Sequence, residues 1–184
     1  MAILRLFGWT LRFEGLPDGC GIALCYPHTS NWDFVIGMLA LWGAGIHGGF
    51  LGKDTLFRVP VLGWFMRRWA GLPVDRSAAS GMTDSIIARF RDEQARGRRV
   101  WFVIAPEGTR KLCPHLKSGF YHIAMKAGVA VGLAFVDYRK REVGMTCYLW
   151  MTGNVEADLA RIAEFYEGKD MARFPDQVSP IRFK

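Results

Sequence analysis

The chain has 184 residues, of which 51% are hydrophobic and 22% charged, and its 24 Lys and Arg against 17 Asp and Glu give a net charge of +7 at pH 7. This length fits one domain of ordinary size, and so much apolar material excludes a disordered or fibrous chain. The longest uncharged stretch, residues 34–52, contains six glycines. Its continuous apolar part of about 13 residues is typical of a buried core helix rather than a membrane span.

The start of the chain and its cysteines indicate the cellular compartment in which we expect the protein. Arg5 and Arg12 interrupt the first apolar run, so no export signal is visible. The four cysteines form no CxxC pair, which favours reduced thiols in a cytoplasmic setting. Cys113, His115 and His122 lack the ligand spacing of known zinc sites, so we expect no metal.

Hydrophobic patterning predicts strands and helices in alternation. In chain order we expect a short helix or strand within 1–14, a strand at 21–27, a helix from Asn31 capped by Ser30 or Asn31, a strand, short helix and strand over 48–74, a helix at 82–97, a strand at 98–108, a helix at 119–127, strands at 129–136 and 145–153, and a helix at 157–166. No repeat or linker divides the chain. The pattern predicts the α/β class: a single domain over residues 1–184, with a mainly parallel or mixed sheet flanked by helices.

A histidine and an aspartate follow the first buried strand. His28 comes directly after the expected strand end at Pro27, and Asp33 lies five positions further on. The two side chains meet only if a turn at Pro27 and Ser30 folds the helix start back toward the strand. A carboxylate beside an imidazole would then make His28 a general base for a substrate hydroxyl. The alternative is that Asp33 is an ordinary first-turn acid and His28 an ordinary turn residue.

A second polar cluster lies where the strand at 98–108 ends, at a position of the kind where open α/β sheets bind ligands. It consists of Glu107, Gly108, Thr109 and Arg110. Backbone N–H groups, the Thr109 hydroxyl and the Arg110 guanidinium form a candidate phosphate site, with Glu107 available to orient Arg110 or hold a hydroxyl. A salt bridge within a surface turn is the alternative.

Further cations extend this positive field. Arg76 comes just after a predicted strand and is a third candidate contact for an anion, although it could instead pair with Asp75. Lys53 and Lys117 are weaker candidates, because single lysines usually mean only a solvated surface.

Three blocks in this order, HTSNWD at 28–33, GLPVDR at 71–76 and PEGTR at 106–110, resemble the glycerophosphate and lysophospholipid acyltransferase family, which includes the 1-acylglycerol-3-phosphate acyltransferases. The resemblance covers roughly residues 22–136. It implies an α/β acyltransferase domain with His28 as the base and Asp33 as its orienting partner. It also implies that the acceptor's phosphate region is bound by Arg76, Glu107, Gly108, Thr109 and Arg110. By the same resemblance the co-substrate is acyl-CoA or an acyl-carrier-protein thioester, with no metal or other cofactor.

We therefore expect an O-acyltransferase that moves a fatty acyl group from a thioester to a lysophospholipid or 1-acylglycerol-3-phosphate hydroxyl, in phospholipid biosynthesis or remodelling. The expected partners are the lysophospholipid acceptor, acyl-CoA or acyl carrier protein, and an anionic membrane surface, with no nucleic acid. The alternatives are a thioesterase or lipid hydrolase, and a non-enzymatic basic protein that binds membrane or nucleic acid.

Apolar residues suggest where lipid is handled. The stretch 34–42 is a candidate lining for an acyl groove, together with Phe57, Leu62, Trp64 and Phe65, although each could equally belong to the core. Residues 1–14 are a candidate membrane-contacting segment, so we expect a cytoplasmic protein attached peripherally to the inner face of a membrane. The individual candidates for this contact are Leu4, Phe7, Trp9, Leu11, Trp64, Phe65 and Trp69, with Arg67 and Arg68 beside them.

Overall fold

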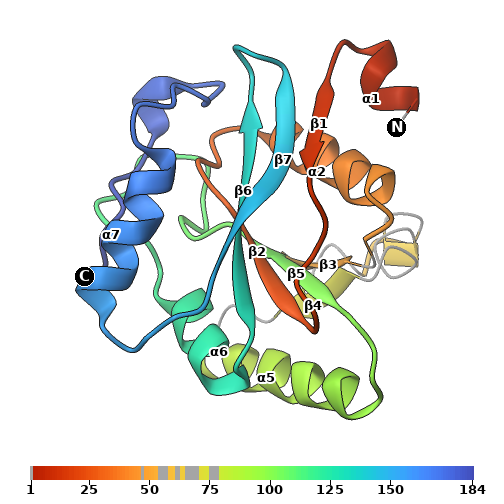
Figure 1. The fold of residues 1–184 in the computed structure, drawn as a ribbon, viewed down its shortest axis with the longest axis vertical. Coiled ribbons are helices and arrows are strands. Elements are labelled where there is room, and N and C mark those ends of the chain that lie inside the picture. The colour runs from red at the N-terminus through yellow and green to blue at the C-terminus, as the bar shows by residue number, and fades with distance from the viewer. Residues whose placement is uncertain (1, 47, 54–57, 61–62, 65–70, 75–78) are drawn as a thin grey trace.

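A computed structural model describes the chain except for residues 1, 47, 54–57, 61–62, 65–70 and 75–78 (Figure 1). The strands of the described part form one seven-stranded sheet in the order β1-β7-β6-β2-β5-β3-β4. Their bounds are β1 Thr10–Phe13, β2 Gly21–Cys25, β3 Gly48–Lys53, β4 Gly71–Val74, β5 Trp101–Ile104, β6 Ala130–Asp137 and β7 Glu142–Leu149. Neighbouring strands are parallel except β6 and β7, which form an antiparallel hairpin. The sheet is therefore mixed and mainly parallel, as the sequence predicts.

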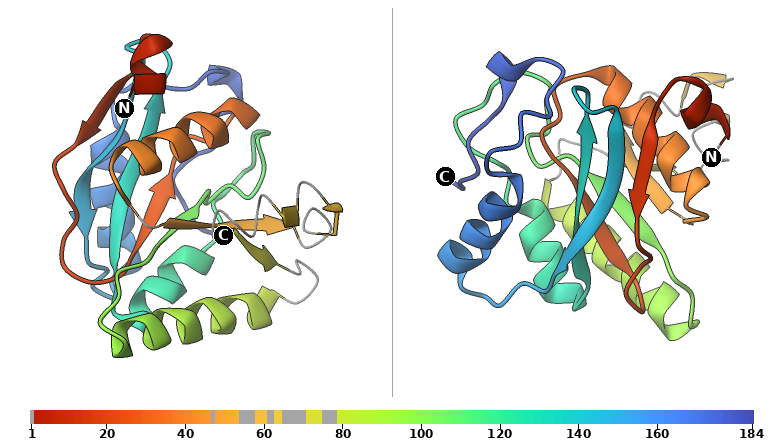
Figure 2. Two further views of the ribbon diagram at one scale, coloured as in Figure 1. Left: turned by 90° about the vertical axis from the view of Figure 1, so that its right-hand side faces the viewer. Right: turned by 45° about the horizontal axis from the view of Figure 1, so that its top comes forward.

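Helices cover both faces of the sheet (Figure 2). They are α1 Ala2–Leu6, α2 Asn31–Gly43, α5 Ala79–Ala95, α6 Gly119–Ala127 and α7 Val155–Tyr166, with a short 3₁₀ turn at Pro175–Gln177. Successive residues of a strand face opposite sides of the sheet. Accordingly Ile22 and Leu24 pack under α5, α6 and α7, whereas Ala23 between them packs under α2. The α/β fold class expected from the sequence is confirmed.

The start of α2 is fixed by a capping box, which satisfies backbone N–H groups that a helix end otherwise leaves free. The Ser30 hydroxyl accepts a hydrogen bond from the N–H of Trp32 at 3.2 Å, and the Asp33 carboxylate accepts one from the N–H of Ser30 at 2.9 Å. Ser30 is thus the cap, as one of the two predicted alternatives had it. No helix in the described part of the chain is both long and apolar enough to cross a membrane.

The last strand differs from the prediction. It runs over Glu142–Leu149, whereas the apolar pattern placed it at 145–153. Its first residue, Glu142, is charged. The strand accommodates this charge because β7 lies beside β1, where Glu142 forms an ion pair with Arg12 at 2.5 Å. A charged side chain therefore sits within a strand, and hydrophobicity alone did not reveal it.

Candidate active site

Two parallel strands bring the polar blocks together. β2 and β5 are hydrogen-bonded neighbours, so their carboxyl ends lie at the same edge of the sheet. His28 follows β2, and Glu107 follows β5. The Glu107 Oε1 accepts a hydrogen bond from the backbone N–H of His28 at 2.8 Å, which ties the two loops to each other.

His28 and Asp33 meet as the sequence spacing suggested. The turn after His28 folds back, and His28 Nδ1 lies 3.1 Å from Asp33 Oδ2. By the usual criteria His28 Nδ1 has no hydrogen-bond partner among the described residues, so the two atoms are in close contact without a well-formed hydrogen bond. The Asp33 side chain is 1% exposed and that of His28 14%, so the carboxylate is buried and the imidazole reaches the site.

The surroundings of Asp33 keep it ionised. Burial alone would raise the pKa of Asp33, but its contacts with His28, the Tyr138 hydroxyl and the N–H of Ser30 outweigh burial and lower that pKa below its ordinary value. A carboxylate that stays charged can fix the tautomer of His28 and stabilise its protonated form.

The pKa of Glu107 is shifted in the opposite direction from that of Asp33. Burial raises the pKa of Glu107 above its ordinary value, opposed in part by the hydrogen bond from the His28 N–H. Its second oxygen, Oε2, is buried without a hydrogen-bond partner among the described residues. Glu107 holds the His28 turn through Oε1, and no bond from either of its oxygens to Arg110 occurs in the part of the chain that the structure describes.

Two cations of the loop after Glu107, Arg110 and Lys117, lie at the site. Gly108 has φ +64°, and a Cβ built there would lie 2.7 Å from Lys117 Nζ, so the lysine side chain lies against the backbone of this loop. Arg110 is exposed, and both Arg110 and Lys117 line the cavity described below. The Thr109 hydroxyl accepts a hydrogen bond from the N–H of Lys111 at 3.3 Å. Gly108, Thr109 and Arg110 therefore lie at the site, and so does Lys117, one of the two weaker candidates.

Two other predicted cations are not placed. Arg76 lies outside the described residues, and Lys53 ends β3 with no described side chain. Among the apolar groove candidates, Phe57, Leu62 and Phe65 also lie outside them.

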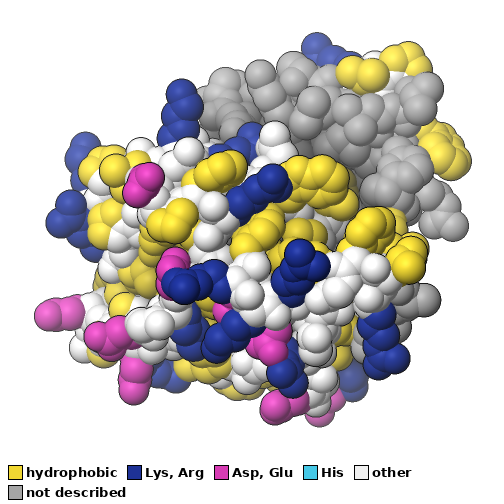
Figure 3. Space-filling model, turned by 90° about the horizontal axis from the view of Figure 1, so that it is seen from above, with side chains coloured by type: hydrophobic (Ala, Val, Ile, Leu, Met, Phe, Trp, Pro, Cys, Tyr) yellow, Lys and Arg dark blue, Asp and Glu magenta, His cyan; other side chains and the backbone are white. Residues whose placement is uncertain are grey.

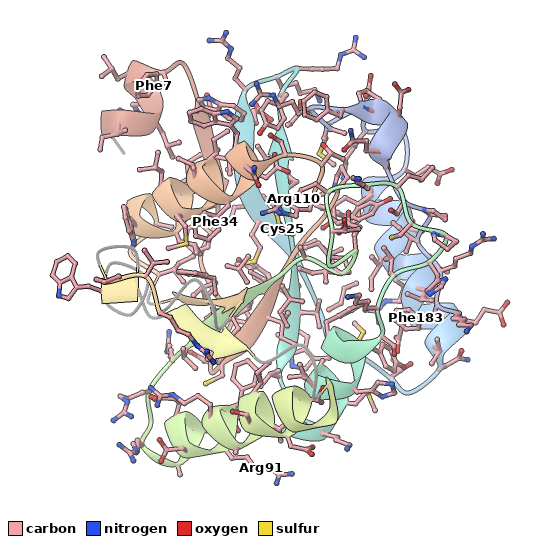
Figure 4. The ribbon with its side chains drawn as sticks, turned by 180° about the vertical axis from the view of Figure 1, so that it is seen from behind. Phe7, Cys25, Phe34, Arg91, Arg110 and Phe183 are labelled. Atoms are coloured by element: carbon pink, nitrogen blue, oxygen red, sulfur yellow. The ribbon has the colours of Figure 1, made fainter. Side chains whose placement is uncertain are left out.

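An apolar cavity of about 400 Å³ opens beside His28 and Asp33. It lies between α2 and the sheet, and its volume is within the range of ligand pockets in proteins. Figure 4 labels Phe34, Cys25 and Arg110, which all line it. The deeper apolar lining comes from Phe13, Met38, Leu41, Ile46, Phe50, Val143 and Met145.

Cys25 lies in this cavity but does not have the properties of a nucleophile. Burial, followed by the charges of Asp33 and Glu107, raises the pKa of its thiol far above the ordinary value. A thiol that stays protonated is a poor nucleophile. No group of three or more His, Cys, Asp or Glu side chains able to hold a metal occurs among the described residues.

The structure adds residues that sequence reasoning missed. Tyr138 follows β6, which is parallel to β2, and its hydroxyl donates to Asp33 Oδ1 at 2.6 Å. The backbone N–H of Phe174 donates to the Thr29 hydroxyl at 3.3 Å, so the C-terminal segment also borders the His28 turn. A polar residue just after a parallel strand was the available signal for Tyr138, whereas no local signal pointed to Phe174.

Comparison with known proteins supports these blocks. A family model described as Acyltransferase matches residues 13–132. The chloroplastic 1-acyl-sn-glycerol-3-phosphate acyltransferase LPAT1 of Arabidopsis thaliana is 30% identical over 126 residues, which are 67% of this chain and 35% of that protein. The chloroplastic 1-acyl-sn-glycerol-3-phosphate acyltransferase BAT2 of Brassica napus is 31% identical over 107 residues, 56% of this chain and 30% of that one. The chain thus spans about a third of the length of these relatives.

A solved structure has the same fold. The crystal structure of PlsC from Thermotoga maritima, a 1-acyl-sn-glycerophosphate acyltransferase, matches with a TM-score of 0.60 and 17% identity, over 89% of this chain and 72% of that one. The family model covers well over half of the chain, including His28, Asp33 and the loop that carries Arg110. On these grounds the chain belongs to the acyltransferase family.

Proposed function

We propose that this protein is an O-acyltransferase that moves a fatty acyl group from a thioester to the free hydroxyl of a lysophospholipid, with 1-acylglycerol-3-phosphate as the first candidate acceptor. The observation that carries the proposal is the His28–Asp33 pair at an apolar cavity that Arg110 and Lys117 also line. The relatives named above act on the same class of acceptor, which supports it further.

In the proposed reaction, His28 is the group that transfers the proton. With Nδ1 directed to Asp33, His28 has Nε2 free to remove the proton of the acceptor hydroxyl. The oxygen attacks the thioester carbonyl carbon, a C–O bond forms, the C–S bond breaks, and the leaving thiolate takes up the proton that His28 held. Because the thiol of Cys25 stays protonated, we propose direct transfer without an acyl-enzyme.

The fatty acyl chain and the acceptor's phosphate suit two different parts of the site. The cavity lining is largely apolar and fits a fatty acyl chain, whose burial is favourable by roughly 0.8 kcal/mol per methylene. Arg110 and Lys117 provide positive charge for the acceptor's phosphate, and positioning both reactants is expected to contribute much of the rate. Acyl-CoA and an acyl-carrier-protein thioester both fit this scheme, with no metal or other cofactor.

We place the enzyme at a membrane as a peripheral protein on the cytoplasmic side, since both its substrates and its product carry acyl chains. The exposed residues Leu6 and Phe7 lie beside the basic turn Arg139–Arg141, where Arg141 donates to the carbonyl of Phe7. Figure 3 views this end of the molecule and shows hydrophobic side chains interspersed with Lys and Arg. Such a surface fits the headgroup layer of an anionic membrane.

The proposal is tested with purified protein, 1-acylglycerol-3-phosphate and acyl-CoA or acyl-carrier protein of several chain lengths. Mass spectrometry follows the diacyl product, and a thiol reagent follows thioester cleavage. We expect cleavage to depend on the acceptor, and His28→Ala to lower the rate by about 10²- to 10⁴-fold.

The control is His122→Ala, because His122 is exposed on α6 and does not line the cavity. It should leave the rate unchanged. Thioester cleavage that proceeds equally without any lysophospholipid would instead identify a thioesterase, and absence of a diacyl product with every acceptor would refute the proposal.

A further inference from the structure

Building on the proposed function, we infer that Tyr138 is a positioning residue that holds Asp33 in the orientation that supports His28. The inference stands on the contacts of the two Asp33 oxygens. Oδ1 accepts the Tyr138 hydroxyl at 2.6 Å. Oδ2 accepts the N–H groups of Thr29 and Ser30 at 3.0 and 2.9 Å and lies 3.1 Å from His28 Nδ1.

The two oxygens of the Asp33 carboxylate are thus held by different parts of the chain. The turn after His28 can hold Oδ2, but it provides no donor for Oδ1 among the described contacts of Asp33. Without the Tyr138 hydroxyl, the carboxylate can rotate about its χ2 angle or draw water to Oδ1, and its contact with His28 loosens. A hydrogen bond to a charged acceptor is stronger than one between neutral groups, so this bond is well suited to fix the rotation.

Tyr138 is itself held by two distant segments of the chain, one that carries Trp9 and one that carries Met171 and Arg173. Its N–H donates to the carbonyl of Met171 at 3.1 Å, and its ring meets Trp9 edge-on with centroids 5.4 Å apart. The Arg173 guanidinium lies 5.7 Å from the centre of the same ring. A hydroxyl placed by this many contacts is a rigid donor, whereas a surface tyrosine would rotate.

The chemical state of Tyr138 also suits a donor. Burial, followed by its bond to Asp33, raises the pKa of the Tyr138 hydroxyl far above its ordinary value. The hydroxyl therefore keeps its proton at neutral pH, where Asp33 is ionised. Tyr138 does not line the cavity, so it acts through Asp33 and not on the substrate.

Tyr138, Trp9, Met171 and Arg173 all lie outside the family match at 13–132. The matched region supplies His28 and Asp33 but not the group that fixes Asp33 Oδ1. The flanking parts of this chain thus complete the support of the pair.

The test compares Tyr138→Phe with a matched control, Tyr121→Phe. Tyr121 makes the same kind of bond, from its hydroxyl to the buried Asp158 carboxylate at 2.9 Å, but this bond joins α6 to α7 and Tyr121 does not line the cavity. Both substitutions keep the ring and remove one hydroxyl. We expect Tyr138→Phe to lower kcat about tenfold with little change in either KM, and Tyr121→Phe to leave kcat unchanged while lowering the melting temperature.

A double-mutant cycle separates positioning from general loss of structure. In an Asp33→Ala background the Tyr138 hydroxyl has lost its acceptor, so adding Tyr138→Phe should cost no further activity. A wild-type kcat in Tyr138→Phe, or an equal loss with and without Asp33, would overturn the inference.

A measurement on the free enzyme keeps this inference distinct from the proposed activity. The ¹⁵N chemical shifts of the His28 ring report its tautomer and its contact with Asp33 without any substrate. We expect them to change in Tyr138→Phe and not in Tyr121→Phe, and unchanged shifts would contradict the role of Tyr138. Failure of the wild-type protein to acylate any lysophospholipid would refute the function alone.

Discussion

At the scale of single residues, the site sets two buried carboxylates in contrasting environments. Asp33 is surrounded by hydrogen-bond donors, which lower its pKa, whereas Glu107 accepts one backbone N–H and burial raises its pKa. Both lie next to His28, Asp33 at the ring and Glu107 at the backbone. One carboxylate can therefore support a positive imidazolium while the other fastens the turn that carries it.

The Glu107 environment predicts a pH-dependent stability. Its folded-state pKa lies above the unfolded value of 4.5, so the folded protein holds a proton that the unfolded chain has released. The free energy of unfolding should then fall as pH rises from about 4.5 through the folded-state pKa. Glu107→Gln keeps an oxygen for the His28 N–H but cannot ionise, so it should escape this fall.

Urea unfolding of both proteins between pH 4 and pH 7 measures the difference in free energy. We expect the free energy of unfolding of Glu107→Gln to increase relative to that of the wild type as pH rises. Asp33 has a lowered pKa, so its contribution is lost only as pH falls below 3.8, and this loss is common to both proteins. A difference that stays constant across the range would show that Glu107 is ionised in the folded state as readily as in the unfolded one.

Arg110 carries a second residue-scale prediction. Its planar guanidinium can form two hydrogen bonds to a phosphate, which the point charge of a lysine cannot reproduce. We expect Arg110→Ala to raise the acceptor KM by at least tenfold. Arg110→Lys should give an acceptor KM between those of Arg110→Ala and the wild type. Initial rates with varied 1-acylglycerol-3-phosphate at fixed donor give these constants.

Arg91→Ala is the control for that experiment, since Arg91 is an exposed arginine of α5 whose guanidinium donates to the Lys126 carbonyl (Figure 4). It should leave both KM values unchanged. If Arg110→Ala altered only donor saturation, the guanidinium would belong to the thioester and not to the acceptor.

At the scale of elements, α2 joins the His28 turn to the cavity. Its first turn carries Asp33, and its next turns present Gly37, Met38 and Leu41 to the cavity. The helix thus sets both the position of the carboxylate and one wall of the apolar space. A glycine inside such a helix costs about 0.5–1 kcal/mol relative to alanine, so Gly37 widens the cavity at some expense in stability.

This position of Gly37 on α2 predicts that a larger side chain there changes the acyl length that the protein accepts. A Cβ at Gly37 meets no atom of the described residues within 4 Å, and Gly37 lines the cavity. We expect Gly37→Leu to lower activity with long acyl donors more than with short ones, because the added side chain takes up part of the cavity.

Gly37→Ala is the matched variant, and it should preserve acyl selectivity while raising the melting temperature through helix propensity. Competition between short and long acyl thioesters in one reaction measures the selectivity. The same ratio of products in wild type and Gly37→Leu would mean that the acyl chain lies elsewhere.

At the scale of the whole molecule, one end combines the site with a surface suited to lipid. The β6–β7 turn lies at the carboxyl end of β6, which is parallel to β2, so it shares an end with His28 (Figure 1). Leu6 is 81% and Phe7 64% exposed at this end.

Of the other predicted membrane contacts, Leu4 was wrong because it is 2% exposed in the core, and Trp9 packs on Tyr138. Leu11 lines the cavity, Trp64 is exposed, and Phe65, Arg67, Arg68 and Trp69 lie outside the described residues.

This surface predicts binding to anionic vesicles. We expect the protein to sediment with phosphatidylglycerol-containing vesicles more than with phosphatidylcholine alone, and to be released in part at 1 M salt, where the screening length falls to about 3 Å. Replacing Leu6 and Phe7 together by Ser should weaken binding at both salt concentrations. Val155→Ser is the control, since Val155 is an exposed apolar residue at the start of α7.

Binding that ignores lipid charge would remove the electrostatic part of the proposal. No sedimentation with either vesicle would contradict the placement at a membrane altogether.

The sequence by itself determined the local elements and the ingredients of the site. The helix at 119–127 has the predicted bounds, the helix from Asn31 begins at the predicted cap, and His28 and Asp33 meet across the predicted turn. These features depend on periodicity, capping and turn residues, which act over a few positions along the chain. The three motif blocks likewise identified the family before any fold was known.

Only the tertiary structure decided the strand order and the contacts between distant residues. It placed β1 beside β7, brought the Glu107 carboxylate to the N–H of His28, and brought the Tyr138 hydroxyl to Asp33 across 105 positions. Periodicity shows that a strand is buried but not which strands flank it, because that choice depends on how the crossovers cover both faces of the sheet. The support of His28 is therefore a property of the folded sheet, in which strand ends far apart in sequence meet at one edge.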